Sequence, residues 1–162
     1  MNQNNSTAGH KPKTMTRYLF LLSVFSLILT GFGQMPIFKR YYIADIPGLG
    51  WLAQFYVTHY LHYLAAILLI TIITYVAVEY LLDGRNKLKI TASGYFRAGI
   101  VLLLVITGGL LVVRNLSGST FTPALIIALD LAHLGLVMAM LAAGTYCVIF
   151  NKKWAEINRK NR

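Results

Sequence analysis

Long apolar runs separated by short polar stretches dominate the chain. Four runs, at about 18–34, 52–82, 95–113 and 123–150, hold few ionisable residues, which gather instead between the runs. A helix of about 20 apolar residues crosses the hydrocarbon core of a bilayer, where a charge costs about 2.5–3.5 kcal/mol on insertion scales. The pattern therefore predicts an all-α integral membrane protein, folded as one compact four-helix bundle.

The ends of the runs carry helix boundary signals. The second run is long, roughly 45 Å at about 1.5 Å per residue, so we expect this helix to tilt or to protrude from the membrane. Asp83-Gly84-Arg85 is expected to end it. Thr122 and Pro123 are suited to the cap and first turn of the fourth helix.

Basic residues are distributed unevenly among the connections. Of the 15 Lys and Arg residues, only Lys39, Arg40 and Arg114 lie in the first and third connections, and the other twelve (15 − 3) lie on the opposite side. The positive-inside rule then predicts that both termini are cytoplasmic. We expect the membrane to be a bacterial inner membrane. Residues 1–16 and 151–162 are expected to be polar tails, with a transmembrane domain at 17–150.

Composition narrows the classes of function. Hydrophobic residues make up 57% of the chain, charged residues 12%, and the mean hydropathy is +0.61. A net charge of +10 would suggest nucleic acid in a soluble protein, but here the positive-inside rule accounts for it, so we expect no nucleic-acid partner. The single cysteine, Cys147, excludes an internal disulfide and any Cys-rich iron–sulfur or zinc site.

Three of the four histidines lie inside predicted spans, where ionisable residues are usually functional. His62 follows Trp51 by eleven residues and His133 follows Thr122 by eleven, so both are expected roughly 16 Å below the same surface. His59 precedes His62 by three residues and lies about 60° around the helix from it. All three side chains are expected to face the interior of the bundle.

Two neutral imidazoles at matched depth on non-adjacent helices meet the requirement of a bis-ligated haem. We expect one haem b with His62 and His133 as axial ligands, and His59 as an alternative ligand, a propionate contact or a hydrogen-bonding group for a quinone. No Cys-x-x-Cys-His motif is present, so a c-type haem held by this chain is excluded.

Small and basic residues at comparable depth are candidates for the surroundings of this haem. Glycines in the first and third helices are expected to let the macrocycle approach the backbone, chiefly Gly33 and Gly108, with their neighbours Gly31 and Gly109. Arg114, with Lys39 and Arg40, is a candidate partner for the propionates. Arg114 is equally well explained as an interfacial anchor.

Simpler interpretations remain open beside the haem. Histidines in membrane helices often form hydrogen bonds between helices, glycines there commonly serve packing, and three histidines at one level are also compatible with a transition-metal site. Asp130, one turn before His133, is suited to fixing a histidine tautomer, to carrying protons for a quinone or to reaching water. No internal repeat is evident in the sequence, which argues against a transporter.

The histidines of the second and fourth helices, His59 or His62 and His133, resemble the ligands of membrane cytochrome b subunits of respiratory oxidoreductases. The architecture is most similar to the four-helix gamma subunit of formate dehydrogenase and related b-type anchors. The resemblance implies electron transfer between an iron–sulfur or multihaem partner subunit and menaquinone or ubiquinone. Two-haem members carry a second ligand pair near the cytoplasmic side, whereas the inner half of this fourth helix offers only Met138, Met140 and Cys147.

The predicted function is therefore that of a membrane cytochrome b subunit linked to the quinone pool. The chain offers no nucleophile–base pair and no phosphate-binding loop, so substrate oxidation is expected in an associated catalytic subunit. The alternative is a haem-free membrane anchor or assembly subunit whose histidines only connect helices.

Overall fold

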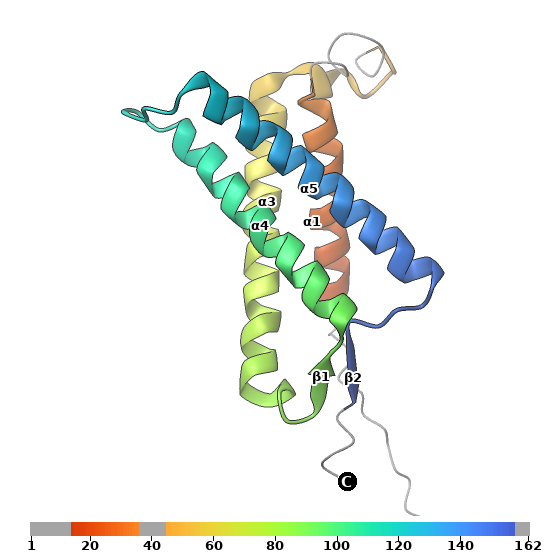
Figure 1. Ribbon diagram of the computed structural model, residues 1–162. Coiled ribbons are helices and arrows are strands. Elements are labelled where there is room, and N and C mark those ends of the chain that lie inside the picture. Colours follow the sequence, from red (N-terminus) through yellow and green to blue (C-terminus); the bar gives the residue numbers. More distant parts are fainter. Residues whose placement is uncertain (1–13, 36–44, 158–162) are drawn as a thin grey trace, which may run out of the picture. The chain divides into compact units, whose positions relative to one another are not determined.

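The structure is a computed structural model that describes residues 14–35 and 45–157 (Figure 1). Its four long helices are all apolar enough to cross a membrane, which confirms the prediction of an all-helical protein with four candidate spans. They are α1 (Thr14–Gly33), α3 (Phe55–Glu79), α4 (Ala92–Arg114) and α5 (Pro123–Ile149). Lys39 and Arg40, two of the predicted propionate partners, lie outside the described residues.

The chain divides into two compact units, residues 1–82 and residues 83–162. Each unit is built on a helical hairpin, α1 with α3 in the first and α4 with α5 in the second. We call them the first and the second hairpin and describe each by itself.

The first hairpin packs through buried residues, most of them small, that recur every seven positions. Ser23 and Thr30 are buried on α1, and Thr58, Ala65 and Ile72 are buried on α3. Small side chains at a seven-residue spacing let two membrane helices approach closely along one face of each. Both α1 hydroxyls donate to backbone carbonyls of the preceding turn, Ser23 to Leu19 at 2.8 Å and Thr30 to Ser26 at 2.6 Å, so their burial leaves no donor unsatisfied.

A short 3₁₀ turn, η1 (Gly50–Ala53), precedes α3. Leu52 of this turn is only 3% exposed, and it lies against Gly33, where a Cβ would be 3.2 Å from the leucine Cδ2. The long second helix therefore begins at Phe55 rather than at the expected Leu52. It continues past Glu79 into a π-helical turn, η2 (Tyr80–Gly84), near the predicted end at Asp83.

In the second hairpin, threonine side chains cap both helices. The Thr122 hydroxyl accepts from the backbone N–H of Leu125 at 3.4 Å, with Pro123 in the first turn of α5, as the sequence predicts. Thr91 caps α4 in the same way, accepting from the N–H of Gly94 at 3.1 Å. Both helix starts are thus fixed by local sequence.

A two-stranded antiparallel ribbon joins the start of α4 to the segment that follows α5. Strand β1 (Leu88–Ile90) pairs with β2 (Ala155–Ile157), with Lys89 opposite Glu156. The Thr91 hydroxyl donates to the Lys153 carbonyl oxygen at 2.8 Å. Residues 151–157, which the sequence analysis assigned to a basic tail, are therefore bound to their own hairpin.

We expect Gly94→Ala to destabilise the second hairpin, because a Cβ on Gly94 would overlap the Trp154 carbonyl oxygen and crowd the Ile90 side chain. Overpacking of this kind typically costs about 1–3 kcal/mol. Thermal unfolding of the detergent-solubilised protein measures the loss. Gly99→Ala is the matched control on the same helix, since a Cβ there has nothing within 4 Å. Equal melting temperatures for the two variants would contradict the packing described here.

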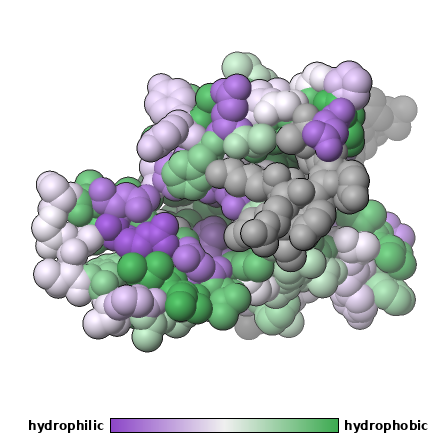
Figure 2. Space-filling view, turned by 90° about the horizontal axis from the view of Figure 1, so that it is seen from above, coloured by the Kyte–Doolittle hydropathy of each residue, from purple (hydrophilic) through white to green (hydrophobic). Residues whose placement is uncertain are grey.

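Most apolar side chains of the four helices are exposed rather than packed. Within the most hydrophobic window of each helix, only 6–11% of the residues are buried. Figure 2, a view from above, shows hydrophilic and hydrophobic residues side by side on the surface that faces the viewer. Apolar helix surfaces without burial are the pattern expected of a multi-pass membrane protein.

Candidate functional site

In the first hairpin, His62 of α3 lies against the carboxyl-terminal part of α1. Its Nδ1 is 2.9 Å from the hydroxyl oxygen of Thr30, which is 2% exposed. The neighbouring Gly31 faces the same ring, because a Cβ there would be 3.4 Å from Cε1 of His62. The imidazole is thus held by a threonine and accommodated by a glycine.

In the second hairpin, His133 of α5 has the same surroundings on α4. Its Nδ1 is 2.9 Å from the hydroxyl oxygen of Thr107, and a Cβ on Gly108 would be 3.3 Å from its Cε1. The predicted ligand His133 and the predicted small residue Gly108 therefore lie in contact. Thr30 and Thr107 were not among the predicted site residues.

The threonine bonds decide which nitrogen of each imidazole carries the proton. A hydroxyl has one proton to donate, and Thr30 donates it to the Ser26 carbonyl while Thr107 donates it to the Leu103 carbonyl at 2.9 Å. While the hydroxyl donates to that carbonyl, each threonine oxygen accepts from the histidine, which corresponds to the tautomer with the proton on Nδ1. The lone pair of the neutral imidazole then lies on Nε2, the nitrogen that a metal ion binds.

This shared arrangement is part of an internal repeat. Five residues of α1 have an identical residue 77 positions later in α4, and His62 of α3 corresponds to His133 of α5, 71 positions later. The five identical pairs between α1 and α4 are Tyr18/Tyr95, Val24/Val101, Leu27/Leu104, Thr30/Thr107 and Gly31/Gly108. Two pairs of buried positions follow the same offsets, Ser23 with Ile100 and Thr58 with Leu129, whereas the other buried helix residues have counterparts that are not buried. No internal repeat was evident in the sequence, because few identities stand between the apolar helices and the connections differ by six residues (77 − 71).

His62 and His133 were each expected eleven residues below the same surface. Counted from the observed helix starts, the two histidines are not equally deep. His62 is seven residues from the start of α3 at Phe55, and His133 is ten residues from the start of α5 at Pro123. The difference of three residues arises because Leu52 and its neighbours form η1 rather than the first turn of α3. What the two histidines share is their position opposite a Thr-Gly pair.

His59 has different partners from His62, one turn away. Its Nδ1 lies 3.2 Å from Oε1 of Gln34, and its ring lies between those of Phe55 and Tyr63, with centroid distances of 5.1 and 4.4 Å. Gln34 also donates from Nε2 to the Thr58 carbonyl at 3.4 Å. The two histidines of α3 are thus bound to different residues of the first unit.

The other predicted site residues have structural partners. Arg114 Nη1 is 3.1 Å from a carboxylate oxygen of Asp130, so the aspartate has a cationic partner rather than a histidine. The pair is partly exposed, with side chains 25% and 53% accessible. Gly33 lies under Leu52 and not beside a histidine.

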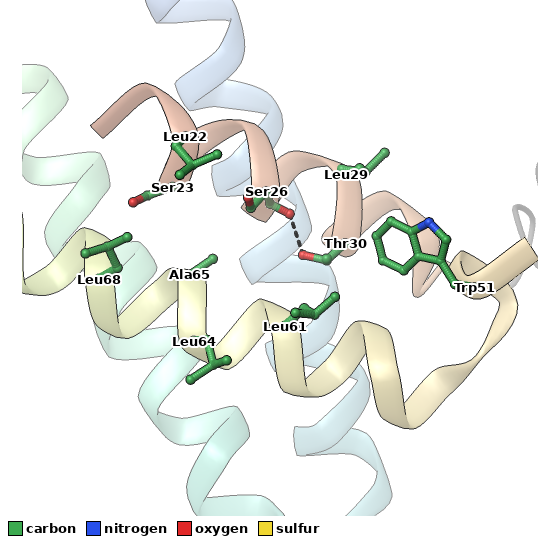
Figure 3. Close-up of a pocket in the computed structure, with 10 residues that line it drawn as sticks. All are labelled: Leu22, Ser23, Ser26, Leu29, Thr30, Trp51, Leu61, Leu64, Ala65 and Leu68. Carbon is green, nitrogen blue, oxygen red and sulfur yellow. Dashed lines mark hydrogen bonds between the residues drawn. The ribbon is translucent and has the colours of Figure 1, made fainter. Parts of the chain in front are cut away.

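Figure 3 shows a pocket between α1 and α3, with the Trp51 indole over one end. Five of its ten lining residues are leucines, and Thr30, which lies against His62, is part of the lining. Its volume of 250 Å³ is below the range of about 300–1,000 Å³ typical of ligand pockets. We assign no ligand to it.

Within residues 14–35 and 45–157, the structure gathers no group of three or more His, Cys, Asp or Glu side chains suited to a metal ion. The three-histidine metal site therefore gains no support from either hairpin. The chain has no significant match to a protein-family model, a curated protein or a solved structure.

Proposed function

We propose that the chain is a membrane cytochrome b subunit that carries electrons through one haem b, with Nε2 of His62 and Nε2 of His133 as axial ligands. The observation that carries the proposal is the repeated unit of histidine, threonine and glycine. The same three residue types in the same contacts occur once in each hairpin. A bis-imidazole haem needs two nitrogen donors, and each hairpin supplies one.

The tautomer and the packing of the two histidines support the proposal. Each imidazole donates from Nδ1 to a threonine, which leaves Nε2 as the metal-binding nitrogen and restrains rotation of the ring. Gly31 and Gly108 leave the space that each ring occupies, and a side chain at either position would fill it. Within the described residues, Nε2 of His133 has no hydrogen-bond partner.

The order of the spans supports the same arrangement. Four successive spans make α3 and α5 run in one direction and α1 and α4 in the other, so the two hairpins form a parallel repeat. Parallel repeats of this kind are related by an axis along the membrane normal. His62 and His133 thus lie on the two helices, α3 and α5, that cross the membrane in the same direction.

When bound, the haem supplies one-electron chemistry, and the chain supplies its environment. His62 and His133 hold the iron, Thr30 and Thr107 keep both ligands neutral and oriented, and the apolar helices exclude water. The proposed orientation, from the positive-inside rule, has both termini in the cytoplasm of a bacterial inner membrane. The proposed electron partners are an iron–sulfur or multihaem subunit, with its catalytic subunit, and a quinone.

The test is spectroscopic. Protein purified in detergent from cells supplied with a haem precursor should show the reduced pyridine haemochrome of haem b, with one haem per chain. A preparation that is folded and helical but contains no haem would overturn the proposal. It would favour the alternative, a haem-free anchor or assembly subunit, which the His62–Thr30 and His133–Thr107 bonds also fit because they connect helices.

Loss of a threonine hydroxyl should weaken haem binding without removing either ligand. We expect Thr107→Val to lower haem affinity by about 10–100-fold, the usual effect of losing the partner of a ligating histidine, and to shift the reduction potential. Haem titration and potentiometry measure both changes. Thr107→Ser keeps the hydroxyl and should behave like the parent protein, so equal affinities for the valine and serine variants would contradict the assigned role.

A further inference from the structure

Three basic residues of the second unit, Arg97, Lys152 and Lys153, have no acidic partner among the described residues. Residues 83–162 contain three acidic side chains, and each of them lies beside a different basic residue. The three pairs are Lys87 with Asp83 at 2.7 Å, Arg114 with Asp130 at 3.1 Å, and Lys89 opposite Glu156 in the ribbon. The charges of Arg97, Lys152 and Lys153 are therefore left for a ligand.

Ser93 joins Arg97 to Lys153. The guanidinium of Arg97 donates from Nε to the Ser93 carbonyl oxygen at 3.2 Å and from Nη2 to the Ser93 hydroxyl at 3.4 Å, which turns it toward the start of α4. The hydroxyl in turn donates to the Lys153 carbonyl oxygen at 3.3 Å. These bonds use two of the five N–H groups of the guanidinium, and the other three have no partner within the described residues.

The segment that carries the two lysines is held by backbone hydrogen bonds. The Lys152 N–H donates to the Cys147 carbonyl at 2.9 Å, which closes α5 with Asn151 in the left-handed conformation (φ 50°). The segment then runs from the end of α5 to the ribbon at the start of α4 (Figure 1). The exposed Lys152 and Lys153 thus have a fixed backbone beside Arg97, and we call these three residues the basic cluster.

Exposed aromatic side chains flank the basic cluster. Phe96, Phe150 and Trp154 are 63%, 57% and 48% exposed, and they adjoin the cluster residues along the chain or lie within two residues of them. They lie at or just beyond the ends of the spans α4 and α5, where aromatic rings are typical at the level of the lipid headgroups. A ligand of the cluster therefore meets positive charge on one side and apolar surface on the other.

We infer that the basic cluster binds the phosphate of an anionic phospholipid, whose acyl chains lie along the exposed apolar surface of the neighbouring spans. A guanidinium is suited to a phosphate, and basic groups next to membrane helices attract anionic headgroups. A soluble anion matches only the charges, whereas a phospholipid matches the charges and the apolar surface. The positive-inside rule requires the charges alone, and the bonds that join Arg97 to Lys153 through Ser93 are what makes this a site.

The experiment uses the fluorescence of Trp154, which adjoins Lys153. The chain has two tryptophans, so Trp51→Phe leaves Trp154 as the single emitter. This full-length protein is reconstituted into phosphatidylcholine vesicles that contain increasing fractions of brominated phosphatidylglycerol or brominated phosphatidylcholine, whose bromine atoms quench a nearby indole. We expect phosphatidylglycerol to be preferred at Trp154 by at least about tenfold, since several basic residues contribute to its binding.

Arg97→Gln and Lys153→Gln, each made in this single-tryptophan protein, should lower the preference about fivefold, the effect of one basic residue at a lipid surface. Lys89→Gln is the matched control, because it removes the same charge from the same ribbon at a residue that lies opposite Glu156. It should leave the preference unchanged. Lys153→Gln alters an exposed side chain, and circular dichroism checks that the helices are retained.

Three results would overturn the inference. One is equal quenching by the two brominated lipids, and another is an equal loss of preference in all three glutamine variants, which would show a diffuse effect of net charge. The third is release of phosphatidylglycerol by inorganic phosphate or by a glutamate-rich peptide, which would assign the cluster to a soluble anion or to a protein segment. None of these measurements involves haem, so their outcome is separate from that of the proposed function.

Discussion

His133→Ala is expected to yield a folded protein without stably bound haem b. The substitution removes one of the two proposed axial nitrogens, and its effect should exceed the roughly 10–100-fold loss of affinity that follows removal of a partner of a ligating histidine. His62→Ala should have the same effect, because the two histidines are equivalent in the repeat. The pyridine haemochrome of the purified variants, per mole of chain, measures the loss.

His59→Ala is the matched control for these two variants. It removes a histidine of the same helix whose Nδ1 is bound to Gln34 rather than to the Thr-Gly pair, so haem content should stay at the parent level. Size-exclusion chromatography and circular dichroism separate loss of haem from loss of fold. Retention of haem by folded His133→Ala would show that this residue is not an axial ligand.

Gly108→Val is expected to displace the imidazole of His133 and to abolish stable haem binding. A Cβ on Gly108 would already be 3.3 Å from Cε1 of the ring, and the additional methyl groups of valine leave the ring no room at its present position. Overpacking by this amount typically costs about 1–3 kcal/mol, and here the strain would fall on a proposed iron ligand. Haem content and the ligand-field bands of the ferric protein measure the result.

Gly109→Val provides the control on the adjacent residue. A Cβ on Gly109 has nothing within 4 Å, so the same gain in volume should leave haem binding unchanged. If both valine variants lose haem equally, the effect is a general one on α4, and the contact between Gly108 and His133 is not its cause. Gly31→Val tests the corresponding contact with His62 in the first hairpin.

Much of the fold followed from residue types along the chain, because the free energy of placing a side chain in lipid depends on that side chain alone. The apolar runs predicted four spans, and Thr122 with Pro123 predicted the start of α5. The ribbon of β1 and β2 was not predicted, because strands of three residues carry no detectable pattern and their pairing depends on segments 60 and more residues apart.

The candidate site was predicted only in part. The three histidines stood out because ionisable residues are rare at membrane depth, and Gly108 was chosen as a small residue nearby. Thr30 and Thr107 gave no comparable signal, since threonine is common in apolar helices and its value here depends on what lies opposite. The contact of His59 with Gln34 and the ion pair of Asp130 with Arg114 could not be predicted either. Each of them joins two segments that are separated along the chain.

The sequence by itself determined the number of spans, the apolar character of every helix surface and the identity of the ionisable groups inside the spans. Only the tertiary structure decided which helix each histidine faces, which nitrogen carries its proton and that the two hairpins repeat one contact. The reason is physical: hydrophobicity is a property of single residues, whereas a hydrogen bond or a close glycine contact exists only when two distant segments are brought together.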